Sequence, residues 1–154
     1  LFYSCCNFAI DKDMEKMTAQ KQIREGTLQF LSVKASCSPE IDCSGGSTVP
    51  NMSTTQELSK DCKKLTITLQ LAVDLFNNEQ KIVANVDVVT RCLFEFDQPL
   101  SVKVIHEPAL CYPFVSAMYQ RTAEKIQREF EIMGYFVQLP LTAFQQVFEV
   151  TSKS

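Results

Sequence analysis

The side chains in this chain that are best suited to act as nucleophiles, bases or metal ligands are seven cysteine thiols and a single histidine, His106. The cysteines lie at positions 5, 6, 37, 43, 62, 92 and 111, without a repeated short spacing. Zinc sites favour pairs of cysteines with two to four residues between them, and the nearest approach to this spacing, Cys37 and Cys43, has five. A disulfide scaffold would use an even set in a smaller secreted chain. We therefore expect no metal site, and we interpret Cys92 and Cys111 as small buried hydrophobic residues kept reduced.

A thiol enzyme is the main catalytic alternative, with Cys111 or Cys92 as nucleophile and His106 as base. No local signature or third, orienting group accompanies that histidine, and Cys111 precedes an apolar helix start. The carboxylates of Asp74 and Asp87 do not form a convincing acid and base pair, because nothing indicates burial or a substrate pocket. The sequence thus predicts a protein that is not an enzyme and has no catalytic residue.

Composition narrows the class further. With 154 residues, 45 % of them apolar and 21 % charged, the chain suits one soluble folded domain. The net charge is −3 and the basic residues are scattered, which argues against nucleic acid. No window approaches the roughly 20 apolar residues of a spanning helix, so no membrane insertion is expected. Residues 1–10 lack a basic start and a small-residue cleavage site, which argues against a secretory signal.

Alternating apolar residues predict an antiparallel sheet. Residues 27–37 form one strand, in which the apolar phase changes at Phe30 and Leu31 and indicates a β-bulge. Residues 65–76 carry their apolar side chains on odd positions, and residues 82–96 carry theirs on even positions. A hairpin with an even-length loop pairs odd with even positions, so both apolar sets fall on one face.

The connections are predicted from composition. Residues 38–62 are rich in Ser, Thr, Gly and Pro and indicate a long crossover rather than a hidden strand. A strand over residues 82–96 would be unusually long, so we expect a bend near Thr90 and Arg91 and a third meander strand beyond it. A short extended piece is expected over residues 100–105.

Helical spacing returns in the last third of the chain. Pro113 suits the first turn of an amphipathic helix that runs to about Met133, with Gly134 as its C-terminal cap. A capping box predicts a short second helix at about residues 143–150. The fold class is therefore α+β: a four-stranded antiparallel meander with a long crossover, backed by a long amphipathic helix and a short C-terminal helix.

Two stretches, residues 86–96 and residues 109–148, together resemble the SecB family of protein-export chaperones. Residues 86–96, VDVVTRCLFEF, are similar to its third and fourth strands. Residues 109–148 repeat its order of Tyr112-Pro113, a long helix, a short apolar loop with Pro140 and a Phe-led helix. The likeness spans about residues 27–150 by order and pattern. The family's Gly-Gly pair is replaced by Arg91-Cys92, the crossover is more polar, and the typical Cys- and acid-rich tail is absent.

The resemblance implies an ATP-independent holdase that assembles as a dimer or a dimer of dimers, needs no cofactor and binds unfolded polypeptides in apolar grooves. It also implies that Asp74 and Asp87, on the exposed sheet face, contact the translocation motor ATPase. Client-binding residues carried over from the family are Ile41, Val49, Met52, Phe136, Leu139, Leu141, Phe144 and Phe148.

Several alternatives stay open. The protein could instead be a chaperone dedicated to a toxin-antitoxin pair, or a structural or ligand-binding domain without chaperone activity. On spacing alone, Phe144, Val147 and Phe148 are ordinary core residues. We expect residues 27–150 to form a single domain in the bacterial cytoplasm, with residues 151–154 as a tail and residues 1–26 as an N-terminal arm that is disordered or not native.

Overall fold

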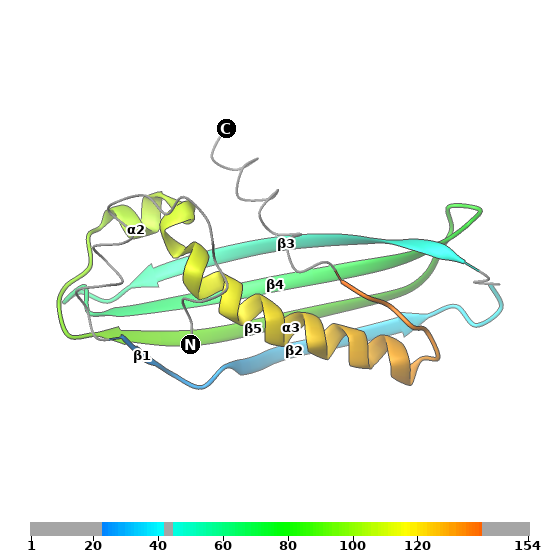
Figure 1. The fold of residues 1–154 in the computed structure, drawn as a ribbon, viewed down its shortest axis with the longest axis horizontal. Helices are drawn as coiled ribbons and strands as arrows, with labels where there is room; N and C mark the ends of the chain where they lie inside the picture. The colour runs from blue at the N-terminus through cyan, green and yellow to red at the C-terminus, as the bar shows by residue number, and fades with distance from the viewer. Residues whose placement is uncertain (1–22, 42–44, 140–154) are drawn as a thin grey trace.

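An antiparallel sheet forms the base of the structure, a computed structural model that describes residues 23–41 and 45–139 (Figure 1). Its strand order is β1-β5-β4-β3, and β2 also pairs with β5. Because β4 occupies the other side of β5, β1 and β2 share one edge and the sheet is four strands wide. The bounds are β1 Ile23–Glu25, β2 Gln29–Cys37, β3 Gly46–Leu58, β4 Lys64–Asn77 and β5 Ile82–Phe96.

The hairpin of β4 and β5 has the register that alternation predicts. Leu65 lies opposite Phe94, and Leu71 lies opposite Val88, so odd residues of β4 face even residues of β5. All four of these side chains are buried. One sheet face is therefore apolar, as expected for a sheet that packs against a helix.

The prediction that residues 38–62 form a loop is wrong. Residues 46–58 form β3, which pairs with β4 over its whole length and occupies one edge of the sheet. The crossover from β2 to β3 is therefore confined to residues 38–45. An edge strand with two largely exposed faces needs few apolar residues, and this explains why its alternation is weak.

The predicted fourth strand is also placed differently. β5 runs unbroken through Thr90 and Arg91 as a strand of 15 residues, so the expected bend and third meander strand are absent there. Instead, β2 carries the irregularity: its register shifts between Phe30 and Ser32, leaving Leu31 without a partner in the ladder. The β-bulge predicted at Phe30 and Leu31 is confirmed.

A second bulge was not expected. Leu75 lies opposite Ala84, but Phe76 lies opposite Ile82, so Val83 is an extra residue in β5. The bulge moves Ile82 from the predicted apolar face to the other face, where it is half exposed, and buries Val83 in its place.

Short helices replace the extended piece predicted over residues 100–105. Helix α2, Lys103–His106, is followed by the 3-10 turn η1, Pro108–Cys111. Val104 is fully buried, and Leu100 is held by a hydrogen bond from its N–H to the carbonyl of Cys62.

Helix α3, Tyr112–Ile132, covers the apolar face over β4 and β5 (Figure 1). It ends as predicted at Gly134, whose φ of 91° is the left-handed conformation that glycine adopts readily. The N–H of Tyr135 donates to the carbonyl of Phe130, and that of Gly134 donates to the carbonyl of Glu131. This pair of bonds is a Schellman motif, which stops the helix.

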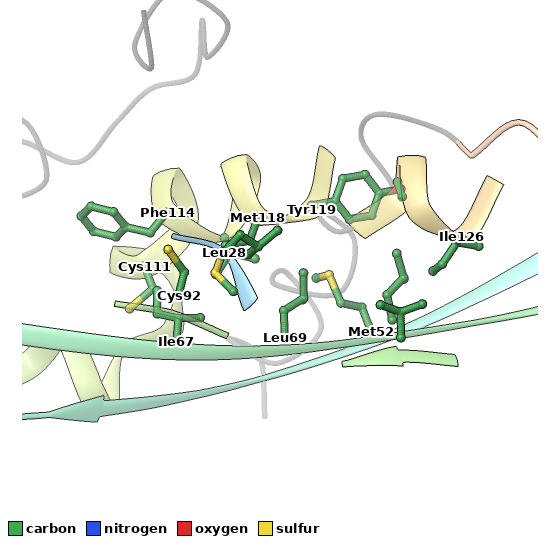
Figure 2. Packing of buried hydrophobic residues seen from close by; sticks show 14 of the residues in the cluster. Leu28, Met52, Ile67, Leu69, Cys92, Cys111, Phe114, Met118, Tyr119 and Ile126 are labelled. Atoms are coloured by element: carbon green, nitrogen blue, oxygen red, sulfur yellow. The ribbon is translucent and has the colours of Figure 1, made fainter. Parts of the chain in front are cut away.

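The core lies between α3 and the sheet (Figure 2). Phe114 anchors the start of the helix, with its ring centroid 4.8 Å from that of Phe94 and 5.7 Å from that of Phe96. After the helix, the chain returns over the sheet, and Val137 and Leu139 join the same cluster. The buried helix residues are Phe114, Val115, Met118, Tyr119, Thr122, Ala123, Ile126 and Phe130.

Candidate functional site

The predicted client-binding residues separate into exposed and buried groups. Phe136, in the segment after α3, is 81 % exposed, whereas Leu139 in the same segment is 8 % exposed and belongs to the core. Ile41 is half-buried in the crossover, where its N–H donates to the carbonyl of Ser38. Leu141, Phe144 and Phe148, and the predicted helix 143–150, lie outside the described residues.

Val49 and Met52 do not share a surface. Met52 lies opposite Leu71 on the side of the sheet that α3 covers, and it is only 6 % exposed. Val49 lies opposite Asp74, on the other side, and is 51 % exposed. Because neighbouring strand positions alternate between faces, β3 cannot present an odd and an even residue together. Of these two, only Val49 is available to a partner.

The side of the sheet away from α3, here called the open face, includes Val49, Asp74, Phe76 and Asp87. The two aspartates lie on it together, as alternation predicts, on adjacent strands β4 and β5. Gln70 Nε2 donates to both carboxylate oxygens of Asp87 at 3.1 and 3.0 Å. Asn85 Nδ2 donates to Asp74 Oδ1. Among the described residues, both carboxylates thus accept hydrogen bonds from neutral amides and not from charged groups.

Both sheet edges are open within the described residues. β3 pairs only with β4, and β2 pairs only with β5. Beside the second edge, Phe30, Leu31 and Val33 of β2 are 43, 48 and 38 % exposed. Free edges offer backbone donors and acceptors to another strand, and exposed apolar side chains offer contact area. Sequence reasoning missed this β2 strip, because an alternating strand gives no sign that the helix stops short of it.

The two cysteines considered as nucleophiles, Cys92 and Cys111, are both buried. Cys111 Sγ donates to the carbonyl of Val104 at 3.5 Å, and burial raises the pKa of the Cys111 thiol to about 12. Nucleophilic thiols have lowered pKa values instead. Cys37 is exposed, Cys92 is buried, and no disulfide links Cys37, Cys62, Cys92 and Cys111. Within the described residues, no group of His, Cys, Asp and Glu could hold a metal ion.

Two further groups have shifted pKa values. The pKa of Asp61 is lowered, chiefly by the hydroxyl of Ser59, which donates to its Oδ1, and by the N–H of Lys63. These bonds close the turn between β3 and β4. Burial raises the pKa of Tyr119 in the core. Neither group belongs to an exposed apolar surface.

Comparison with solved structures identifies the arrangement. A SecB-like chaperone from Mycobacterium tuberculosis, in complex with a ChAD peptide from the HigA1 antitoxin, superposes with a TM-score of 0.59 at 14 % identity. The match covers 84 % of this chain and 97 % of that chain. The chain has the SecB-like fold. The resemblance found in the sequence is confirmed at this level: an antiparallel sheet four strands wide with a long helix on one face.

Other comparisons add little to the SecB-like fold. A Streptococcus agalactiae protein of unknown function matches with a TM-score of 0.40 at 11 % identity, over 78 % of this chain and 98 % of that chain. No protein-family model and no curated protein matches the sequence. None of the helices in the described residues is long and apolar enough to cross a membrane.

Proposed function

We propose that this protein is an ATP-independent chaperone that holds unfolded or preprotein polypeptides through exposed apolar side chains. One observation carries the proposal: Phe136 is 81 % exposed, although Val137 and Leu139 anchor the same segment in the core. A large apolar side chain fixed in solvent by its buried neighbours is a ready contact for an extended client. The SecB-like fold supports this role, and we expect no catalytic step and no cofactor.

A dedicated client is the second candidate. The Mycobacterium neighbour holds a peptide from an antitoxin, so a toxin-antitoxin partner is a specific alternative to general export. In the export alternative, the open face around Asp74 and Asp87 contacts the translocation motor ATPase. Both versions place the protein in the bacterial cytoplasm as a homo-oligomer, a dimer or a homotetramer.

Suppression of client aggregation tests the proposal. An unfolded client is diluted into buffer with stoichiometric protein, and light scattering follows its aggregation. We expect the parent protein to suppress scattering and Phe136→Asp to suppress it much less. The matched control is Val102→Asp, because Val102 is also an exposed apolar residue but lies at the start of α2. Both variants should keep the unfolding transition of the parent.

The outcomes separate the alternatives. If the parent suppresses aggregation of no client, the holdase proposal is wrong. If it binds a peptide from an antitoxin but not unfolded preproteins, the dedicated role is supported over export. If Phe136→Asp and Val102→Asp behave alike, client binding does not use Phe136.

A further inference from the structure

We infer that strand β1 is displaceable, and that an extended client segment takes its place beside residues 93–96 of β5. The inference rests on the proposed chaperone function, and it names the client chemistry that this site prefers: apolar residues at alternate positions of an extended segment. Strand β1, Ile23–Glu25, has three residues, whereas its neighbour β2 has nine. Both strands pair with β5, so β1 covers only the short stretch of β5 that β2 does not reach.

Few hydrogen bonds hold β1 in place. The N–H of Gly26 donates to the carbonyl of Leu93 at 2.7 Å, so the backbone groups of Leu93 face the β1 side. The N–H of Phe96 instead donates to the residue just before β4 at 2.8 Å. Because these directions alternate along an antiparallel ladder, the backbone groups of Glu95 also face β1. Within β1, Arg24 and Glu95 are therefore the one hydrogen-bonded pair.

The chain directly after β1 is anchored more firmly. Besides the bond that Gly26 makes to Leu93, the carbonyl of Gly26 accepts a hydrogen bond from the buried thiol of Cys92 at 3.4 Å. A Cβ atom on Gly26 would lie 2.8 Å from the carbonyl oxygen of Leu93, so this close approach requires glycine. Leu28 is buried in the core. β1 can therefore leave while the chain from Gly26 onward keeps its place, as in the local opening of a terminal segment.

The position that β1 occupies would be filled better by a different sequence. Glu25 lies opposite Phe94, and Ile23 lies opposite Phe96. Phe94 and Phe96 are buried on the apolar face of the sheet, where their rings contact that of Phe114. Aromatic and β-branched residues on opposite strands stabilise a sheet, whereas glutamate is depleted in strands. A client segment with Val or Ile at both positions would pair with β5 more favourably than β1 does.

The register also defines the backbone of the client. The client segment must run antiparallel to β5 and offer Glu95 the N–H and carbonyl that Arg24 now provides. In strand addition, main-chain hydrogen bonds supply affinity and alternate side chains supply selectivity. The site would therefore accept many sequences that share one pattern, which suits a chaperone.

Substitutions in the full chain test the inference by changing the stability of β1. The probe is a fluorescein-labelled peptide of alternating Val and Thr with lysines at one end, and fluorescence anisotropy measures its Kd. Arg24→Pro removes the N–H that β1 donates to Glu95, and we expect this variant to bind the peptide about three-fold more tightly. Glu25→Val should bind it about three-fold more weakly, because a firmer β1 lowers the fraction of open protein.

Two controls accompany these variants. Glu57→Val makes the same replacement at an exposed position of β3, the strand at the other edge of the sheet, and should leave Kd unchanged. A peptide of the same sequence with methyl groups on alternate backbone nitrogens lacks the donors of strand addition and should not bind.

Hydrogen exchange of the parent tests the opening of β1 without any variant. The amide of Glu95, which faces β1, should exchange much faster than that of Phe96, which donates on the β4 side. Saturating peptide should slow exchange at Glu95 and leave exchange at Phe96 unchanged.

Equal protection of Glu95 and Phe96 in the free protein would overturn the inference, as would Kd values that do not rise from Arg24→Pro through the parent to Glu25→Val. Protection of Glu95 that follows protein concentration rather than peptide would assign the site to a second copy and not to a client. Peptide binding in the expected order without suppression of client aggregation would leave the β1 site standing and refute the holdase proposal. Suppression without peptide binding would do the reverse.

Discussion

The hydroxyl oxygens of Thr90 in β5 and Thr122 in α3 lie 3.1 Å apart, and both side chains are fully buried. Thr122 donates to the carbonyl of Met118 at 2.7 Å, so the hydrogen between the two threonines comes from Thr90. The hydroxyl of Thr90 also donates to the carbonyl of Leu69, at the longer distance of 3.5 Å. In an otherwise apolar core, this pair ties the helix to one position along the sheet.

Valine substitutions should therefore have unequal effects. Thr122→Val leaves the Thr90 hydroxyl with only its long bond, and we expect it to lower the free energy of unfolding by about 1–2 kcal/mol. Thr90→Val should cost less, because Thr122 keeps its bond to Met118. Urea unfolding of both variants and of the double variant measures these changes.

The double variant tests the coupling. Replacing both partners removes an unsatisfied group as well as a bond, so its cost should be smaller than the sum of the single costs. Simple additivity would show that the two hydroxyls do not act together.

The sequence predicted the centre of the sheet better than its edges. β4 and β5 each have one buried and one open side, so their apolar residues alternate, and their pairing follows from the parity of the two strands. β3 at the edge is lined by Ser, Thr, Asn and Gln, and its only buried residue is Met52. A strand that buries one side chain has almost no alternation to detect.

The candidate site was less predictable, because the accessibility of two of its predicted residues depends on whether residues 38–62 contain the edge strand β3. If residues 38–62 were a loop, Val49 and Met52 could face one groove. As a strand, they point to opposite sides of the sheet. Phe136 and Leu139 could not be told apart by composition either, since only the path of the chain after the Schellman motif buries one and exposes the other.

The bulge at Val83 reverses the burial that the sequence alternation predicts for Ile82 and Val83. Alternation places Ile82 in the core, but the structure exposes it and buries Val83. We expect Ile82→Ser to change the free energy of unfolding by less than about 0.5 kcal/mol. Val83→Ala should lower it by roughly 2 kcal/mol, through lost burial and the cavity left behind. Thermal or urea unfolding compares the two variants directly. If Ile82→Ser lowers the free energy of unfolding more than Val83→Ala does, the register of β5 described here is wrong.

Burial of Cys111 predicts a dependence of stability on high pH. The thiol ionises near pH 9.0 in the unfolded chain but near 12 in the folded protein. Between these values, the unfolded chain releases a proton that the folded protein retains, so the free energy of unfolding falls as pH rises. This single group contributes a slope of about 1.4 kcal/mol per pH unit, and its contribution is constant below pH 9.0.

Cys111→Ala isolates the thiol, because Tyr119 and every other titrating group remain. The variant is less stable at neutral pH through lost packing, but the stability difference from the parent should shrink above pH 9.0. Denaturant unfolding at a series of pH values measures it. Parallel curves for the two proteins would show that the thiol is not held neutral.

Gly46, the first residue of β3, lies closer to the backbone of Phe76 in β4 than a residue with a Cβ atom could. A Cβ built on Gly46 would lie 2.0 Å from the carbonyl oxygen of Phe76, a backbone atom that cannot swing aside. Gly46→Ala must therefore displace the start of β3, and we expect a loss of about 1–3 kcal/mol in the free energy of unfolding. Hydrogen exchange should rise at the start of β3 while the β4 and β5 pairing stays protected. Ser47→Ala, at the next, exposed position, is the control and should be close to neutral. Equal stability of Gly46→Ala and the parent would mean that the start of the edge strand does not approach β4 as closely as this.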